Sequence, residues 1–243
     1  YYPSKLMPWL YNDKLQSPVD AILDEAAKHG MKVFMSTGRA KDQDDNLLDP
    51  VIKERQLQIM EELASLYKNH KAFYGWYLPV EDCLCPIFAE HAVQSVNALT
   101  EKAHSLTPGK KTLISPYGIG LSEFDHPDFE KQMAKLKVDI IAYQDEVGCV
   151  RDKFTLPRLK KNWQRMRDIH NRLNIEMWAN CETFTWEEGT NDRQSALIPA
   201  AYSRLLSQQV AASVAGVDKI ISFMFGGIIE DPKSAYQLGQ PVW

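Results

Sequence analysis

Residues 72–81 have the sequence AFYGWYLPVE, a short apolar run that ends in a proline and a glutamate. A short apolar run that is rich in aromatic residues is typical of a buried strand in a parallel sheet. Comparable runs recur along the chain and predict six such strands: Lys32–Ser36, Ala72–Leu78, Lys111–Pro116, Asp139–Gln144, Ile175–Asn180 and Lys219–Phe225. Tyr1–Pro3 has the composition expected at the end of a further strand.

Amphipathic segments separate the predicted strands. Two of them begin at a capping residue followed by proline, at Ser17 and Asp49, and two stop at glycine, at Gly30 and Gly216. We predict helices over Pro18–His29, Pro50–Asn69, Ile87–Leu106, Pro127–Lys135, Pro157–Leu173 and Ala196–Ala215. The alternation of strand and helix with short links predicts an α/β fold with a parallel sheet.

The repeat fits a (β/α)8 TIM barrel that occupies residues 1–243 as a single domain. If Tyr1–Pro3 ends the second strand, the six complete strands are strands three to eight. We then expect the first strand and part of the second β/α unit, roughly 40–80 residues, to lie upstream of the sequence given. A seven-stranded or open barrel is the alternative.

Composition excludes several classes of function. The 243 residues include 28 basic and 32 acidic ones, a net charge of −4 that gives no reason to expect nucleic acid as a partner. No apolar run approaches the length of a membrane-spanning helix. A glycine-rich dinucleotide or phosphate loop is absent, and we expect no cofactor. The four cysteines lack the spacing of a zinc site, and we expect no bound metal.

Two glutamates stand at the carboxyl ends of predicted strands, which is where TIM barrels place their working residues. Glu81 ends strand four in this count, and Glu182 ends strand seven. Side chains alternate between the two faces of a strand, so residues an even number of positions apart share a face. Glu81 then shares a face with Tyr77, and Glu182 shares one with Trp178 and Asn180. If those faces line the barrel interior, both carboxylates project into its mouth. A glycosidase needs two such carboxyl groups, one to protonate the departing sugar oxygen and one to attack the anomeric carbon or activate water.

Aromatic and polar residues around these strand ends are candidates for binding a sugar. The expected substrate-binding residues are Arg39, Tyr77, Tyr117, Tyr143, Gln144, Asp145, Trp178, Asn180 and Phe184. In this set Tyr143 is also a candidate to orient Glu182 by a hydrogen bond, and Asp145 is a candidate to point inward because it shares the parity of Tyr143. Asp82 and Glu146 are interpreted as loop or capping carboxylates.

The two glutamates are similar in placement to those of clan A glycoside hydrolases, which are retaining barrels. That resemblance implies that Glu81 is the acid/base and Glu182 the nucleophile, although this chain has Val80-Glu81 where the clan often has Asn-Glu. A closer resemblance is to an uncharacterised family of glycoside-hydrolase-like barrels found mainly in gut Bacteroidetes and catalogued as a domain of unknown function. It is carried by residues 34–38, 75–81, 142–148 and 178–184, with sequences FMSTG, GWYLPVE, AYQDEVG and WANCETF.

The resemblance implies an oligosaccharide or polysaccharide as the ligand and export to the periplasm or cell surface. The leading hypothesis is therefore a glycoside hydrolase. Two alternatives stay open: a barrel that binds carbohydrate without cleaving it, and a barrel enzyme of different chemistry, such as a lyase or a metal-dependent hydrolase.

Overall fold

The computed structural model describes residues 2–7, 17–38, 46–148, 155–188 and 195–224. The chain forms two compact units. The first comprises Tyr1–Val80, Glu90–Ile114 and Leu136–Asp139, and the second comprises Glu81–Ala89, Ser115–Lys135 and Ile140–Trp243. Arg39, which the sequence predicts to bind substrate, lies outside the described residues, so its role stays a prediction.

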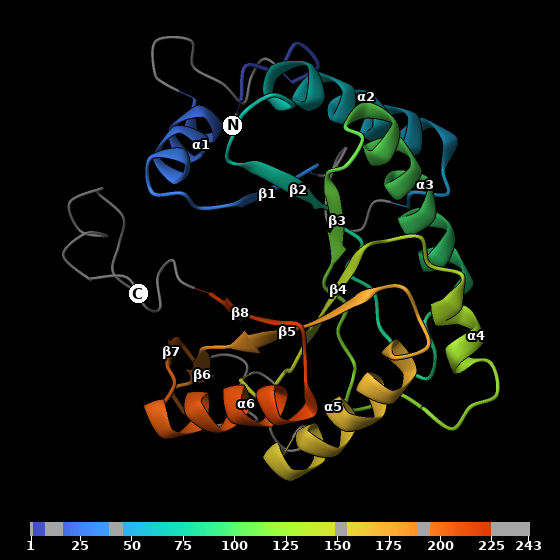
Figure 1. The fold of residues 1–243 in the computed structure, drawn as a ribbon, viewed down its shortest axis with the longest axis vertical. Helices are drawn as coiled ribbons and strands as arrows, with labels where there is room; N and C mark the ends of the chain where they lie inside the picture. The colour runs from blue at the N-terminus through green and yellow to red at the C-terminus, as the bar shows by residue number, and fades with distance from the viewer. Residues whose placement is uncertain (1, 8–16, 39–45, 149–154, 189–194, 225–243) are drawn as a thin grey trace. The chain divides into compact units, whose positions relative to one another are not determined.

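The first unit contains three parallel strands with helices between them. Its elements are α1 (Pro18–Lys28), β1 (Val33–Ser36), α2 (Pro50–Tyr67), β2 (Phe73–Tyr77), α3 (Glu90–Leu106) and β3 (Lys111–Ile114). Strand β2 pairs in parallel with β1 and with β3, and α2 contacts α3 (Figure 1). Two predicted helix starts are confirmed: Ser17 Oγ accepts a hydrogen bond from Asp20 N, and Asp49 Oδ1 accepts one from Val51 N. The third helix begins at Glu90 rather than at the predicted Ile87.

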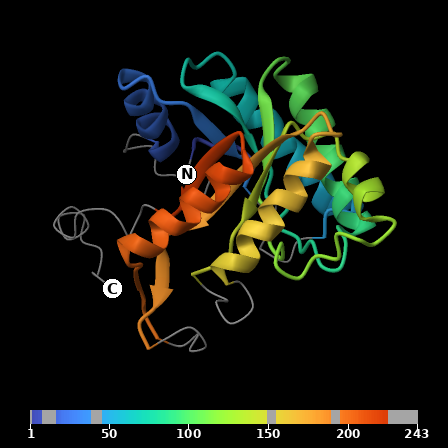
Figure 2. The ribbon, with the colours of Figure 1, turned by 60° about the horizontal axis from the view of Figure 1, so that its bottom comes forward.

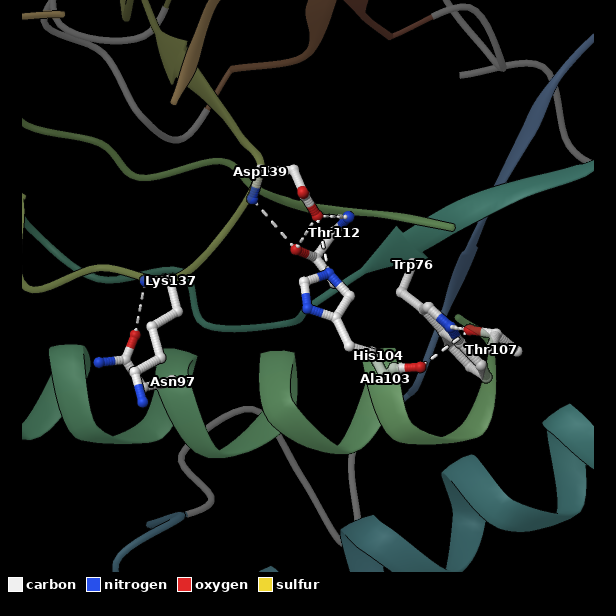
Figure 3. A network of polar contacts seen from close by, with 8 residues as sticks. All are labelled: Trp76, Asn97, Ala103, His104, Thr107, Thr112, Lys137 and Asp139. Atoms are coloured by element: carbon white, nitrogen blue, oxygen red, sulfur yellow. Dashed lines mark hydrogen bonds and ion pairs between the residues drawn. The ribbon is translucent and has the colours of Figure 1, made fainter. Parts of the chain in front are cut away.

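A polar network lies at the amino ends of the strands of this unit (Figure 3). Asp139 Oδ2 accepts hydrogen bonds from the backbone N and the Oγ1 of Thr112, each at 2.7 Å, and lies 3.0 Å from Nε2 of His104 on α3. Trp76 Nε1 donates to Thr107 Oγ1 at 2.8 Å. These contacts satisfy buried polar groups and so serve stability, as is usual at the amino-terminal face of a barrel.

The second unit contains the strands β4 (Ile140–Gln144), β5 (Glu176–Glu182) and β8 (Lys219–Phe223), which are parallel, with β5 paired to both of the others. Its helices are α4 (Phe129–Ala134), α5 (Leu156–His170) and α6 (Tyr202–Ala215). Helices α5 and α6 lie side by side (Figures 1 and 2). Helix α6 ends at Gly216, where the sequence predicts it to end, with a left-handed φ of 79°.

Helices α4 and α5 differ from their predicted bounds by one to three residues at each end, and two further predicted boundaries are wrong because strands pair there. Helix α6 begins at Tyr202 rather than at Ala196, because Leu197–Pro199 forms strand β7. This strand pairs in an antiparallel manner with β6 (Phe184–Trp186), an element that the sequence pattern does not predict. Strand β5 also continues to Glu182 instead of ending at Asn180, because β8 pairs with its residues from Trp178 to Glu182.

Candidate active site

The candidate site lies within the second unit, at the carboxyl ends of its strands. Glu182 is the last residue of β5 and is only 4% exposed. Its Oε2 accepts a hydrogen bond from the backbone N–H of Gly148 at 2.7 Å. A Cβ at residue 148 would lie 2.7 Å from the same oxygen and 2.6 Å from the carbonyl oxygen of Phe184. Glycine is therefore the residue that lets the backbone approach this carboxylate so closely.

Glu81 belongs to a segment that is attached to the chain following β3. The backbone N–H of Leu84 donates to the carbonyl of Tyr117 at 2.8 Å, and the N–H of Tyr117 donates to the carbonyl of Asp82 at 3.2 Å. The carboxylate of Glu81 is exposed, and its Oε1 accepts a hydrogen bond from Gln144 Nε2 at 2.7 Å. Gln144 is the last residue of β4, so this bond connects Glu81 to that strand end.

Ser115 joins these groups to strand β5. Gln144 Nε2 also donates to the carbonyl oxygen of Ser115 at 2.9 Å, and Asn180 Nδ2 donates to Ser115 Oγ at 3.0 Å. Ser115 Oγ donates its own proton to the carbonyl of Ala142, so it must accept from Asn180. The structure thus brings together three residues that the sequence predicts for the site: Glu81, Gln144 and Asn180.

Asn180 carries an unsatisfied acceptor on the same face of β5 as Glu182. The bond to Ser115 fixes which end of the amide is nitrogen, because Ser115 Oγ acts as the acceptor there. Among the described residues, the other end, Oδ1, has no hydrogen-bond partner. An unpaired buried acceptor is costly, and a donor supplied by a ligand or a water molecule would remove that cost.

Glu146 lies in the loop after β4, as the sequence interpretation has it, and its carboxyl group is buried beside the candidate site. It is 7% exposed, and its Oε2 accepts a hydrogen bond from the backbone N–H of Gly118 at 2.6 Å. Burial raises the pKa of Glu146 to about 7; the Gly118 bond opposes this rise, and the charges of Glu182 and Asp145 add to it. Its place two residues after a predicted strand was the available signal.

The carboxylate of Asp145 forms hydrogen bonds to helix α6 and to the backbone at the end of β5. It is fully buried, and its Oδ1 accepts hydrogen bonds from the backbone N–H groups of Glu182 at 3.1 Å and Val147 at 3.3 Å. Its Oδ2 accepts one from Gln208 Nε2 on α6 at 2.5 Å. Burial raises the pKa of Asp145 to about 6. The expectation that Asp145 points inward to substrate is wrong, since its carboxylate is enclosed by protein groups.

The expected hydrogen bond between Tyr143 and Glu182 is also wrong. The Tyr143 hydroxyl lies 2.6 Å from Nε2 of His170 on α5, and the tyrosine is fully buried. His170 Nδ1 lies 2.9 Å from the carbonyl of Ile175 and must donate to it, so Nε2 accepts the tyrosine proton. Burial lowers the pKa of His170 to about 4, which keeps the imidazole neutral. Tyr143 therefore ties β4 to α5 and does not touch the site.

The predicted aromatic residues differ in how much of each ring is available to a ligand. Trp178 and Phe184 are 4% and 5% exposed. The Trp178 ring also lies 4.6 Å from Lys219 Nζ, and its Nε1 donates to Glu176 at 3.1 Å. Tyr117 is 39% exposed within the second unit, while Tyr77 is half-buried in the first. Phe223, which the sequence did not single out, is 50% exposed and lies 6.1 Å from the Phe184 ring.

The described residues include three of the four cysteines. Cys83, Cys85 and Cys181 are free thiols, and Cys149 lies outside the described residues. Within the described ranges, no cluster of three or more histidine, cysteine, aspartate or glutamate side chains is arranged to hold a metal ion. The same ranges contain no helix that is both long enough and apolar enough to cross a membrane.

Comparison with solved structures shows that the fold is a partial (β/α)8 barrel. A "putative alpha-L-fucosidase" from Bacteroides thetaiotaomicron VPI-5482 matches 98% of this chain and 74% of its own, with 22% identity and a TM-score of 0.73. A GH10 xylanase from Thermobacillus composti matches 91% of this chain and 71% of its own, with 15% identity and a TM-score of 0.57. A GH5_18 protein from Streptomyces cattleya, in complex with Manβ1-4GlcNAc, matches 87% of this chain and 58% of its own, with 14% identity and a TM-score of 0.57.

The sequence itself places the chain in a family. Residues 1–236 match the family described as domain of unknown function (DUF4434), and the chain belongs to that family. No curated protein matches the sequence. The resemblances stated from the sequence, to a domain of unknown function and to clan A glycoside hydrolases, are thus confirmed at the level of family and fold.

Proposed function

We propose that this protein is a glycoside hydrolase that cleaves an oligosaccharide or polysaccharide by a retaining mechanism. Glu182 is the nucleophile in this proposal, and Glu81 is the acid and then the base. The observation that carries it is the hydrogen-bonded set of Glu81, Gln144, Ser115 and Asn180, of which Asn180 lies on the same strand as Glu182. This set of residues lies at the carboxyl ends of the strands, in a fold that solved glycoside hydrolases share.

The environment of Glu182 suits a nucleophile. The bond from Gly148 N–H favours the ionised carboxylate, and the bond from its own N–H to Asp145 fixes the backbone that carries it. In the first step the Glu182 carboxylate attacks the anomeric carbon, and the bond to the leaving oxygen breaks as Glu81 transfers a proton to that oxygen. In the second step Glu81 takes a proton from water, whose oxygen displaces Glu182 from the sugar.

The environment of Glu81 suits a residue that exchanges protons. It is exposed, so a leaving group and an incoming water molecule can both reach it. Its bond from Gln144 Nε2 holds one carboxyl oxygen in place and leaves the other for proton transfer. Asn180 and the exposed ring of Tyr117 supply groups of the kinds that bind sugar hydroxyls and sugar faces.

The proposal is tested by incubating the protein with a panel of oligosaccharides and polysaccharides and measuring released reducing ends. We expect turnover of at least one glycan, with an initial product that keeps the anomeric configuration of the substrate, as followed by NMR. Glu182→Gln and Glu81→Gln should each lower kcat by more than about a thousandfold. Glu130→Gln, which removes an exposed carboxylate of α4, is the matched control and should keep full activity.

The outcomes separate the alternatives. Glycan binding without turnover would contradict the hydrolase proposal and favour the alternative of a barrel that binds carbohydrate without cleaving it. Turnover with inverted configuration would remove Glu182 as nucleophile, and turnover that survives Glu182→Gln would contradict the proposal outright.

A further inference from the structure

Glu146 adopts a backbone conformation that side chains rarely take. Its φ is 52°, in the left-handed region, and among the described residues it is the one non-glycine with a positive φ. Left-handed backbone at a residue with a Cβ is disfavoured, and it persists only where the surroundings impose it. Here the carboxyl group gains burial and the bond from Gly118 N–H at 2.6 Å. The conformation is therefore tied to where the side chain is placed.

The same turn connects Glu146 to Glu182. Gly148, two residues further along, donates its N–H to Glu182 Oε2 at 2.7 Å. Val147 N–H between them bonds to Asp145 Oδ1, which also accepts the N–H of Glu182. The turn at residues 146–148 thus buries one carboxyl group and at the same time presents a donor to the other.

The two carboxyl groups are both buried, and the charge of Glu182 acts on Glu146. Glu182 at the end of β5 and Asp145 directly after β4 act electrostatically on Glu146, and so do Tyr117 and Cys83 on neighbouring segments; all four groups become negative on ionisation. A cation of the same region is Arg204 on α6, which donates to the carbonyl oxygen of Phe184 and whose charge acts on Cys181. When two buried carboxyl groups share such a site, ionising both is unfavourable, and one of them keeps its proton. Glu182 and Glu146 each accept one backbone N–H bond.

We propose that Glu146 is a positioning residue for Glu182: a neutral carboxyl group that fixes the turn at residues 146–148 and leaves the negative charge of the pair on Glu182. This inference rests on the proposed function of Glu182. Burial raises the pKa of Glu146 to about 7, in agreement with a proton that stays on this group through the mildly acidic range. Glu146 neither forms nor breaks a bond in the reaction, and its proton stays on it throughout the cycle.

The protonation of Glu146 is tested without any substrate. In the full-length protein with isotope-labelled glutamate carboxyl carbons, NMR should show one buried carboxyl that titrates near pH 7 and disappears in Glu146→Gln. Labelling of glutamate alone separates this signal from Asp145. A Glu146 signal that is already ionised at pH 5 would overturn the inference, whatever the protein does to glycans.

The positioning role is tested on a cleaved glycan with two variants. Glu146→Ala removes the acceptor for Gly118 N–H and should lower kcat by about 10- to 100-fold at pH 5–6 with little change in KM, because Glu182 loses its alignment. Glu146→Gln keeps a neutral acceptor and should recover most of that loss. A Gln variant that is as impaired as the Ala variant would overturn the role, since it would show that Glu146 must exchange a proton. Failure of the whole panel to be cleaved, with a protonated Glu146 seen by NMR, would contradict the proposed function alone.

Discussion

At the scale of single residues, Gly148 is a tightly constrained position of the candidate site. Replacing it with alanine would place a Cβ 2.7 Å from Glu182 Oε2 and 2.6 Å from the Phe184 carbonyl oxygen. We expect Gly148→Ala to displace the carboxylate and lower kcat on a cleaved glycan by about 10- to 100-fold, which steady-state kinetics measures.

The matched control for this change is Gly30→Ala. Gly30 has a φ of 66° and open space around it, so an alanine there strains the backbone without touching the candidate site. It should lower the unfolding midpoint and leave kcat unchanged. Equal kcat values for Gly148→Ala and the natural protein would show that the position of Glu182 does not limit the reaction.

Individual residues also show how far sequence parity can be used. On β5 the parity argument places Trp178, Asn180 and Glu182 on one face. In the pairing with β8, Trp178 lies opposite Lys219, and its ring contacts the Lys219 ammonium. On β4 the same argument excludes a shared face for Tyr143 and Gln144, although both were expected to bind substrate. Glu146 escaped prediction because its left-handed φ ends the alternation that parity assumes.

At the scale of elements, the hydrogen bond between Tyr143 and His170 joins β4 to α5. Tyr143→Phe would leave the buried Nε2 of His170 without a donor. We expect a loss of about 1–3 kcal/mol in the free energy of unfolding, measured by urea denaturation, with kcat unchanged. A large fall in kcat at unchanged stability would instead restore Tyr143 to the substrate-binding residues expected from the sequence.

Element boundaries were predicted well where local chemistry sets them and poorly where pairing sets them. Ser17, Asp49 and Gly216 mark helix ends through caps and a left-handed turn, which are visible in the sequence. Leu197–Pro199 was included in a helix because its apolar character suits either structure, and only its pairing with Phe184–Trp186 makes it a strand. A single sequence carries no signal for such a distant partner.

At the scale of the whole molecule, fold stability depends on carboxylates away from the candidate site, as at Asp139. Burial opposes its ionisation, but hydrogen bonds from Thr112 and His104 outweigh burial and lower the pKa of Asp139. Its contribution to stability is therefore complete above the ordinary aspartate pKa and is lost as the pH falls through the lowered value. Asp139→Ala should cost about 2 kcal/mol at pH 7, with a smaller cost near pH 3, by chemical denaturation at each pH.

Asp128→Ala is the control, because Asp128 is an exposed residue whose carboxylate pairs with Lys131 on the surface. It should change stability little at either pH. A cost for Asp139→Ala that does not vary with pH would mean that its carboxylate is not ionised in the folded protein.

The barrel fold and the family were predictable because a repeat spread over the whole chain specifies them, whereas the candidate site depends on a few contacts that form only in the folded protein. The central claim is that Glu182 acts as the nucleophile of a glycoside hydrolase. It is tested most directly by reacting the protein with a slow fluorinated glycosyl donor of the sugar that the panel identifies, and then locating the attached sugar by peptide mass spectrometry. We predict that the sugar is bound to Glu182 and that Glu182→Gln prevents labelling. Sugar attached to Glu81, Glu146 or any other residue would contradict the assignment.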